Sequence, residues 1–160
     1  MNSPPRLVLF QPDIPQNAGT LLRLAACLGV AVDIVEPCGF LMDDRKMRRA
    51  GMDYLGKIEP VRHSSFSALE TTRKGGGGRL ILLTTSGDVR LDRFVFQGGD
   101  RVMVGRESAG VPDEVAACAD VRLVVPMVPG VRSLNVAAAA TLALGEALRQ
   151  LDLFPKGEYR

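Results

Sequence analysis

The sequence predicts an α/β protein in which a mainly parallel sheet is flanked by helices. Short apolar segments of strand length alternate with longer segments that carry leucine and alanine at helical spacing. The loops between them are short, as in strand–helix–strand units, whose parallel strands need a helical crossover. Because 160 residues have the length of one domain, we expect residues 1–160 to form a single domain around a sheet of five or six strands.

The first strand–helix–strand unit occupies the N-terminal end of the chain. Residues 6–10 (RLVLF) form an apolar segment that we expect to be a buried strand. Asn17 is placed to cap a helix over residues 18–28, and Gly29 is placed to end it. Residues 31–35 (AVDIV) then provide the second strand, after a crossover short enough for a parallel pair.

The middle of the chain contains weaker signals. A short strand over residues 58–61 includes a proline, which places it at an edge of the sheet. A helix is expected over residues 64–74, with a serine at its N-terminus, and a clear strand is expected over residues 79–83. Residues 91–96 favour neither a strand nor a helix, so their structure stays open.

The C-terminal part alternates strands and helices again. Residues 101–104 (RVMV) and 121–125 (VRLVV) are expected to be strands, and Pro112 starts a short helix between them. A long helix rich in alanine and leucine follows, for which Ser133 is placed as the N-cap. Its four consecutive alanines, residues 137–140, leave little side-chain bulk, so we expect this helix to form much of a dimer interface.

The composition is that of a folded protein. Hydrophobic residues make up 46% of the chain and charged residues 24%, which is enough to form a core. The three cysteines are widely spaced and His63 is the single histidine, so we expect no metal site and no disulfide framework. Residues 151–160 are expected to be a mobile tail.

Charge and hydropathy bound the compartment and the partners. No apolar segment is long enough to span a membrane, and residues 1–5 do not begin an export signal, so we expect no membrane association and a cytoplasmic location. The formal net charge is only +2, so any binding of nucleic acid must depend on local patches. Helical spacing puts Arg45, Arg48 and Arg49 on one face, which is either an ordinary solvated surface or a phosphate-binding one.

The loop over residues 126–135 (PMVPGVRSLN) separates the last strand from the last helix. Pro126 and Pro129 restrict the backbone, so the loop can continue neither the strand nor the helix. It ends at a helix N-terminus, where backbone N–H groups at the positive end of the helix dipole favour a carboxylate or a phosphate. The alternative interpretation is a well-capped helix that only packs on the sheet.

In an open α/β sheet, ligands bind beyond the carboxyl ends of the strands. Four loops with special residues are expected there, over residues 12–17, 84–87, 105–110 and 126–135. The polar residues available in or near them are Asn17, Arg23, Glu107, Ser133 and Asn135. This set contains no Ser–His–Asp triad and no cluster of metal ligands. A reaction that needs neither stays open, above all transfer of a group from an already activated donor.

Three motifs give the sequence a resemblance to a known family. The first is PQNAGTLLR over residues 15–23, with an extension over residues 36–54. The second is GRESAGVP over residues 105–112, and the third is PMVPGVRSLN over residues 126–135. In this order they resemble the SpoU class (SPOUT superfamily) of RNA 2′-O-ribose methyltransferases, and within it the group that methylates the wobble nucleotide of tRNA (TrmL type). The resemblance extends from about residue 7 to about residue 151.

The resemblance implies a fold, a cofactor and partners. The C-terminal helix would thread through a loop to form a deep trefoil knot, and S-adenosylmethionine would bind there in a bent shape, leaving as S-adenosylhomocysteine. The enzyme would be a homodimer whose active site draws residues from both subunits, and its substrate would be tRNA. The residues implied at the cofactor are Leu83, Gly105, Val125 and Ser133, with Met127 and Leu134 nearby.

The resemblance also implies roles for individual side chains. Arg23 would be the catalytic arginine that engages the target ribose and its phosphate, and Glu107, Ser133 and Asn135 would shape the acceptor pocket. An arginine is a poor base at its ordinary pKa, so stabilisation of a developing alkoxide is one role for Arg23 and action as the base is the other. The residues implied in RNA binding are Asn17, Arg23, Arg45, Arg48, Arg49 and Arg132.

Two alternatives stand beside the methyltransferase. A non-catalytic RNA-binding relative with the same fold would bind tRNA without binding the cofactor. A nucleotide-dependent oxidoreductase is disfavoured, because the GxGxxG motif is missing after the first strand. Arg106 and Ala109 stand where related enzymes often carry a proline and an arginine, so the choice of RNA stays open.

Overall fold

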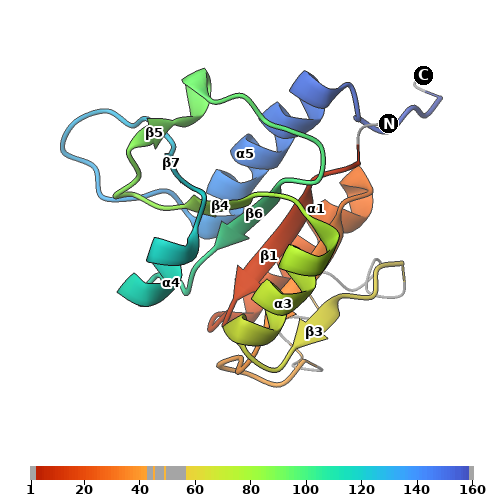
Figure 1. Cartoon of the computed structure of the whole chain (residues 1–160), viewed down its shortest axis with the longest axis vertical. Helices are drawn as coiled ribbons and strands as arrows, with labels where there is room; N and C mark the ends of the chain where they lie inside the picture. The colour runs from red at the N-terminus through yellow and green to blue at the C-terminus, as the bar shows by residue number, and fades with distance from the viewer. Residues whose placement is uncertain (1–2, 43–44, 46–48, 50–56, 159–160) are drawn as a thin grey trace.

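The computed structural model describes residues 3–42, 45, 49 and 57–158, and shows a central sheet with helices on both faces (Figure 1). Seven strands are described, in the order β3-β2-β1-β6-β4-β7-β5, and every neighbouring pair is parallel. The strands are β1 (Arg6–Phe10), β2 (Ala31–Val35), β3 (Val61–His63), β4 (Leu80–Leu83), β5 (Val89–Arg90), β6 (Arg101–Val104) and β7 (Val121–Val124). The predicted fold class is therefore confirmed, although the sheet has more strands than expected.

The helices cover the two faces in pairs. The helical segments are α1 (Pro15–Leu28), α3 (Phe66–Gly76), the 3₁₀ helix η1 (Leu91–Arg93), α4 (Asp113–Cys118) and α5 (Val136–Leu151). In Figure 1, α1 and α5 lie behind the sheet, and α3 and α4 lie in front of it. Successive residues of a strand point to opposite faces, and β1 shows the result. Leu7 and Leu9 pack with α1 and α5, whereas Val8 and Phe10 pack with α3 and α4.

The strands and helices lie close to their predicted positions where the apolar signal is strong. The strands predicted over residues 6–10, 31–35 and 101–104 have those bounds. The weak strand predicted over residues 58–61 was placed too early, since β3 is Val61–His63. The ambiguous segment at residues 91–96 begins with the 3₁₀ helix, directly after β5.

Two of the predicted helix caps are wrong. Ile14, and not Asn17, precedes α1, because Pro15 supplies the fixed backbone angle that suits a first helical position. Asn135, and not Ser133, caps α5, because its Oδ1 accepts hydrogen bonds from Ala137 N at 2.8 Å and Ala138 N at 3.3 Å. Asn17 and Ser133 are consequently not used as caps and remain available for contacts in the adjoining loops.

The alanine run of α5 mainly serves the core of the chain itself. Ala137 and Ala140 are buried against the sheet, and α5 packs beside α1 on the same face. Ala138 is exposed, and so are Thr141 and Leu142 one turn later. The exposed face of α5 therefore includes these residues, whereas Ala137 and Ala140, two of the four alanines expected at a dimer interface, face the core.

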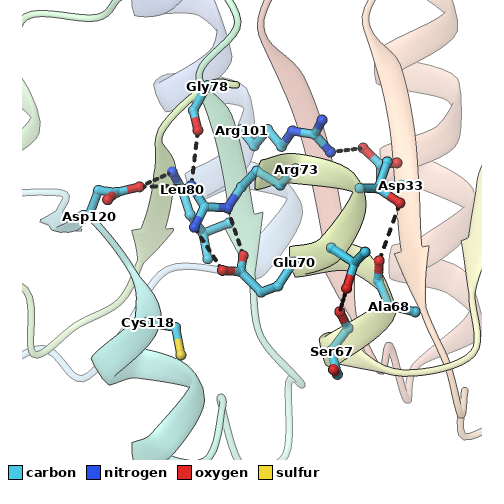
Figure 2. Close-up of polar contacts among 12 residues, drawn as sticks. Asp33, Ser67, Ala68, Glu70, Arg73, Gly78, Leu80, Arg101, Cys118 and Asp120 are labelled. Carbon is cyan, nitrogen blue, oxygen red and sulfur yellow. Dashed lines mark hydrogen bonds and ion pairs between the residues drawn. The ribbon is translucent and has the colours of Figure 1, made fainter. Parts of the chain in front are cut away.

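A buried group of charges fixes α3 to the edge of the sheet (Figure 2). The guanidinium group of Arg73 donates two hydrogen bonds of 2.7 Å to Glu70, and Nη1 donates to the Gly78 carbonyl at 3.0 Å and to Asp120 Oδ2 at 3.1 Å. Asp120 Oδ2 also accepts a bond from Leu80 N at 2.7 Å. The hydrogen bonds that Arg73 donates to Glu70 raise the pKa of Arg73, so this guanidinium stays charged. It joins the end of α3 to the start of β4 and to the connection before β7.

A second buried charge cluster lies on β1, β2, β3 and β6. Asp33 accepts hydrogen bonds from Arg6 Nε at 2.7 Å and Nη2 at 3.1 Å, and it lies 2.9 Å from His63 Nε2. Arg101 lies 3.6 Å from the same carboxylate (Figure 2). His63 is therefore bonded within the core, and no Ser–His–Asp arrangement involves it among the residues that the structure describes.

Within the described parts of the chain, none of the helices combines the length and the apolar character needed to cross a membrane. The knot and the mobile tail over residues 151–160 stay predictions.

Candidate functional site

A cavity of about 510 Å³ lies at the carboxyl ends of β4, β6 and β7. All six residues expected at the cofactor line it, namely Leu83, Gly105, Val125, Met127, Ser133 and Leu134. Asn17, Glu107 and Asn135 line it as well. The structure thus brings the loops over residues 84–87, 105–110 and 126–135 together with the start of α1, as predicted from the topology of an open sheet.

The strand register explains why these loops meet. Leu83, the last residue of β4, lies opposite Val104 of β6 and Leu123 of β7. The three chains therefore leave the sheet side by side. Thr84 N continues the contact by donating a hydrogen bond to Leu123 O at 2.9 Å. The floor of the cavity is consequently backbone and apolar side chain, held rigidly by the central strands.

The loop of the second motif, residues 105–110, is closed by its own hydrogen bonds. Arg106 N donates to Gly110 O at 3.1 Å, and Gly110 N donates to Arg106 O at 2.8 Å. A Cβ atom on Gly105 would lie 2.8 Å from the carbonyl carbon of Gly110, and Gly110 has φ +58°. The turn itself therefore requires both glycines. Their presence is explained without the close approach to a ligand that glycines in such a loop usually suggest.

Arg106 is held at the mouth of this loop. Its Nε donates to Gly110 O at 2.9 Å, and its guanidinium carbon lies 5.8 Å from the centre of the Phe10 ring. Because Arg106 also lines the cavity, it places a positive charge at the site.

Asn17 and Asn135 form a hydrogen-bonded pair on the cavity wall. Asn135 Oδ1 faces the first N–H groups of α5, so its Nδ2 is the group that donates to Asn17 Oδ1, at 3.2 Å. Asn17 uses its oxygen in this bond, so what it can offer a ligand is its NH₂ group. The cap of α5 thereby orients a side chain from the first turn of α1.

Glu107 is bound to Asp13, a residue that sequence reasoning did not place in the site. Glu107 N donates to Asp13 Oδ1 at 3.1 Å, and Asp13 N donates to Glu107 Oε2 at 3.3 Å. The hydroxyl of Ser108 donates to Asp13 Oδ2. The sequence did contain one indication of this role. Asp13 lies in the loop over residues 12–17, one of the four loops expected to meet beyond the carboxyl ends of the strands.

The two carboxyl groups of this pair have opposite pKa shifts. Burial raises the pKa of Glu107, and its hydrogen bond with Asp13 raises it further. The same hydrogen bond holds the pKa of Asp13 below its ordinary value, against a smaller opposing effect of burial. The Asp13 carboxyl group therefore loses its proton at a lower pH than the Glu107 carboxyl group.

Four of the predicted RNA-binding arginines are not among the described residues that line the cavity. Arg23 is exposed on α1, six residues after Asn17 and so roughly 9 Å further along the helix. Arg45, Arg49 and Arg132 are exposed too, and none of the four is among the described residues that line the cavity. Arg48, with most of the extension over residues 36–54, lies outside the described residues.

The chemistry of the cavity suits a nucleoside with a charged substituent. One wall is apolar, and contains Leu83, Val125 and Met127. The other side offers amide, hydroxyl and carboxyl groups. The volume falls in the range of about 300–1,000 Å³ that is usual for small-molecule sites. Groups of three or more histidine, cysteine and acidic side chains that would hold a metal are not found in the described part of the chain.

Comparison with known proteins gives one consistent family. Residues 4–145 match the SpoU rRNA Methylase family. A tRNA (cytidine(34)-2'-O)-methyltransferase of Beijerinckia indica is 53% identical over 150 residues, which cover 94% of each chain.

Solved structures agree with this match. One from work on the 2-OH methylation of C/U34 on tRNA has a TM-score of 0.89 and 41% identity, and the match covers 94% of this chain and 97% of that one. The SpoU methyltransferase AviRb from Streptomyces viridochromogenes, solved with the cofactor AdoMet, has a TM-score of 0.85 and 25% identity, over 97% of this chain and 60% of its own. The chain belongs to the SpoU rRNA methylase family.

Proposed function

We propose that the chain transfers a methyl group from S-adenosylmethionine to a ribose 2′-hydroxyl of tRNA, at the wobble nucleotide of the anticodon, cytidine or uridine. The observation that carries the proposal is the cavity at the ends of β4, β6 and β7, which all six residues implied at the cofactor line together. The relative from Beijerinckia indica and the structure from work on C/U34 support the choice of substrate.

On the cofactor side, the apolar wall of Leu83, Val125 and Met127 would hold the adenosine, with Gly105, Ser133 and Leu134 around it. The cofactor supplies a methyl group on a sulfonium, which is already a good electrophile. The protein therefore has to place an acceptor oxygen in line with this methyl group, and exclude water, more than it has to activate the donor. The AdoMet complex of AviRb supports this assignment.

On the acceptor side, Glu107, Ser133 and Asn135 line the same cavity, and Asn17 adds an NH₂ donor. Amide and hydroxyl groups of this kind can hold a ribose without competing for the methyl group. The positive charge of Arg23 would bind the neighbouring phosphate and stabilise the oxygen as it loses its proton. The second role that stays open for Arg23 is that of the base that removes the proton from the 2′-hydroxyl.

The position of Arg23 supports a homodimer. Arg23 is not among the described residues that line the cavity of its own chain. It is exposed on α1, and Leu142 is exposed on the neighbouring α5, with 49% of its surface accessible. A second copy packed on this pair of helices would cover the leucine and bring its own Arg23 toward the cavity. The active site would then be completed across the interface.

The remaining arginines supply contacts for the RNA backbone. With a net charge of only +2, binding of RNA must depend on local groups. Arg45, Arg49 and Arg132 are exposed. Arg48, predicted to act with them, lies outside the described residues. A tRNA substrate is consistent with a location in the cytoplasm.

The proposal is tested with purified protein, tRNA and S-adenosylmethionine that carries a labelled methyl group. We expect label on a ribose 2′-oxygen at the wobble position, and no label with Arg23→Ala, whose circular dichroism should match the wild type. Label on a base would contradict the proposal. Binding of tRNA without any binding of S-adenosylhomocysteine would favour the non-catalytic RNA-binding relative instead.

A further inference from the structure

We propose that Asp13 is a positioning residue that fixes the loop over residues 105–110, and with it Glu107, against the segment that begins α1. The catalytic consequence of this role rests on the proposed function. The loop forms one wall of the cavity, and the start of α1 contributes Asn17 to another, so Asp13 would join the two walls.

The contacts of Asp13 cross between segments that are far apart in the sequence. Its Oδ1 accepts from Glu107 N at 3.1 Å, its Oδ2 accepts from the Ser108 hydroxyl, and its own N–H donates to Glu107 Oε2 at 3.3 Å. Backbone and side chain of Asp13 are thus both paired with Glu107, and the side chain is paired with Ser108 as well. A reciprocal arrangement of this kind sets the position of the loop as well as the direction of the Glu107 side chain.

A third segment holds Asp13 in place from behind. Gly39 N donates to Pro12 O at 2.9 Å. A Cβ atom on Gly39 would lie 2.9 Å from Asp13 Cβ and 3.0 Å from its Cα, so the two backbones are in close contact. Asp13 cannot retreat from the loop without displacing this segment, and it is therefore a fixed acceptor and not a flexible surface carboxylate.

The pKa shifts of Asp13 and Glu107 arise from the same contacts. Asp13 receives hydrogen bonds from an amide and a hydroxyl, which stabilise its charge, whereas Glu107 is half-buried. Burial and the bond with Asp13 raise the pKa of Glu107, and Asp13 is the charged neighbour that acts on it. Arg106 on the same loop is directed to Gly110 O and Phe10. Glu107 is thereby held against Asp13 through the bonds that the two backbone N–H groups donate.

This arrangement has a consequence for the acceptor site. The hydrogen bonds with Asp13 hold Glu107 in place before any ligand binds, so that binding does not have to order the loop. Loss of Asp13 would release the loop and the side chain together.

The experiment compares Asp13→Ala and Asp13→Asn in the full chain. Asp13→Ala removes both acceptor oxygens, and we expect S-adenosylhomocysteine to bind about tenfold more weakly or worse, the effect of losing a charge-assisted hydrogen bond. Asp13→Asn keeps the acceptor for Glu107 N, so affinity should return part of the way to the wild-type value. Asp92→Asn, in an exposed ion pair with Arg90, is the matched control and should bind as the wild type does.

A carbon-13 NMR titration of the Glu107 carboxyl tests the pair independently of ligand binding. We expect a pKa above the ordinary 4.5 in the wild type, and a lower pKa in Asp13→Asn, because an amide can donate to Glu107 but cannot share its proton. An unchanged titration together with unchanged affinity in both variants would overturn the proposal. If the wild type fails to bind S-adenosylhomocysteine, the proposed function fails, while the titration still decides the role of Asp13.

Discussion

At the scale of single residues, buried charges are held by partners that lie far away in the sequence. Asp33 is 1% exposed and is surrounded by Arg6, His63 and Arg101. Burial alone would raise the pKa of Asp33, but the hydrogen bonds from Arg6 and His63 more than offset this effect and lower it. Sequence reasoning identified the strands that carry these residues and missed the cluster, because nothing local indicates which charges will meet.

The depressed pKa makes a prediction about stability. The stability that the Asp33 carboxylate contributes is fully present above its ordinary pKa of 3.8, and it is lost as the pH falls toward the lowered value in the folded chain. Asp33→Asn should reduce the free energy of unfolding at pH 7 by about 3 kcal/mol, because it leaves the buried Arg101 and the partly buried Arg6 without their carboxylate. Urea denaturation at pH 7 measures this, and a change no larger than that of Asp92→Asn would contradict it.

At the scale of elements, continuous apolar segments predicted the strands well, whereas the ends of the helices depended on geometry. The strand at residues 101–104 was predicted with its correct bounds from the local sequence alone, and all four of its residues are buried. The caps were misassigned because Asn17, Ser133 and Asn135 are all good capping residues. Which of them caps a helix is decided by where the loop turns, and Pro15 moved the start of α1 to an earlier position.

The corrected cap of α5 is testable with a matched pair of variants. Asn135→Ala removes the acceptor for Ala137 N and Ala138 N, and should reduce the free energy of unfolding by about 1 kcal/mol. Ser133→Ala, two residues earlier and outside the cap, should leave thermal unfolding unchanged. A larger loss from Ser133→Ala would restore the assignment that the sequence alone suggested.

At the scale of the whole molecule, the site follows from the order of the strands. The class of the sheet and the convergence of loops at its carboxyl edge were predictable, because they hold for parallel α/β sheets in general. The order itself was not predictable, since β6 lies between β1 and β4 although it follows both in the sequence. For the same reason Asp13 was missed, as its contact with Glu107 depends on β1 and β6 being neighbours.

Assembly is the second property of the whole molecule. In the proposed homodimer, Leu142→Glu places a charge on the exposed face of α5. It should convert the dimer to a monomer and abolish methyl transfer, because Arg23 of the second copy would be withdrawn from the site. Val95→Glu is the control, since Val95 is also exposed and apolar, with 72% of its surface accessible. Light scattering after size exclusion measures the mass. A wild-type chain that is monomeric at micromolar concentration would contradict the proposed interface.

The most direct measurement of the central claim is a crystal structure of the chain with S-adenosylhomocysteine. We predict that the nucleoside lies at the carboxyl ends of β4, β6 and β7, against Leu83, Gly105 and Val125, with Met127 and Leu134 closing over it. A complex in which this cavity is empty and the nucleoside is bound elsewhere would contradict the account.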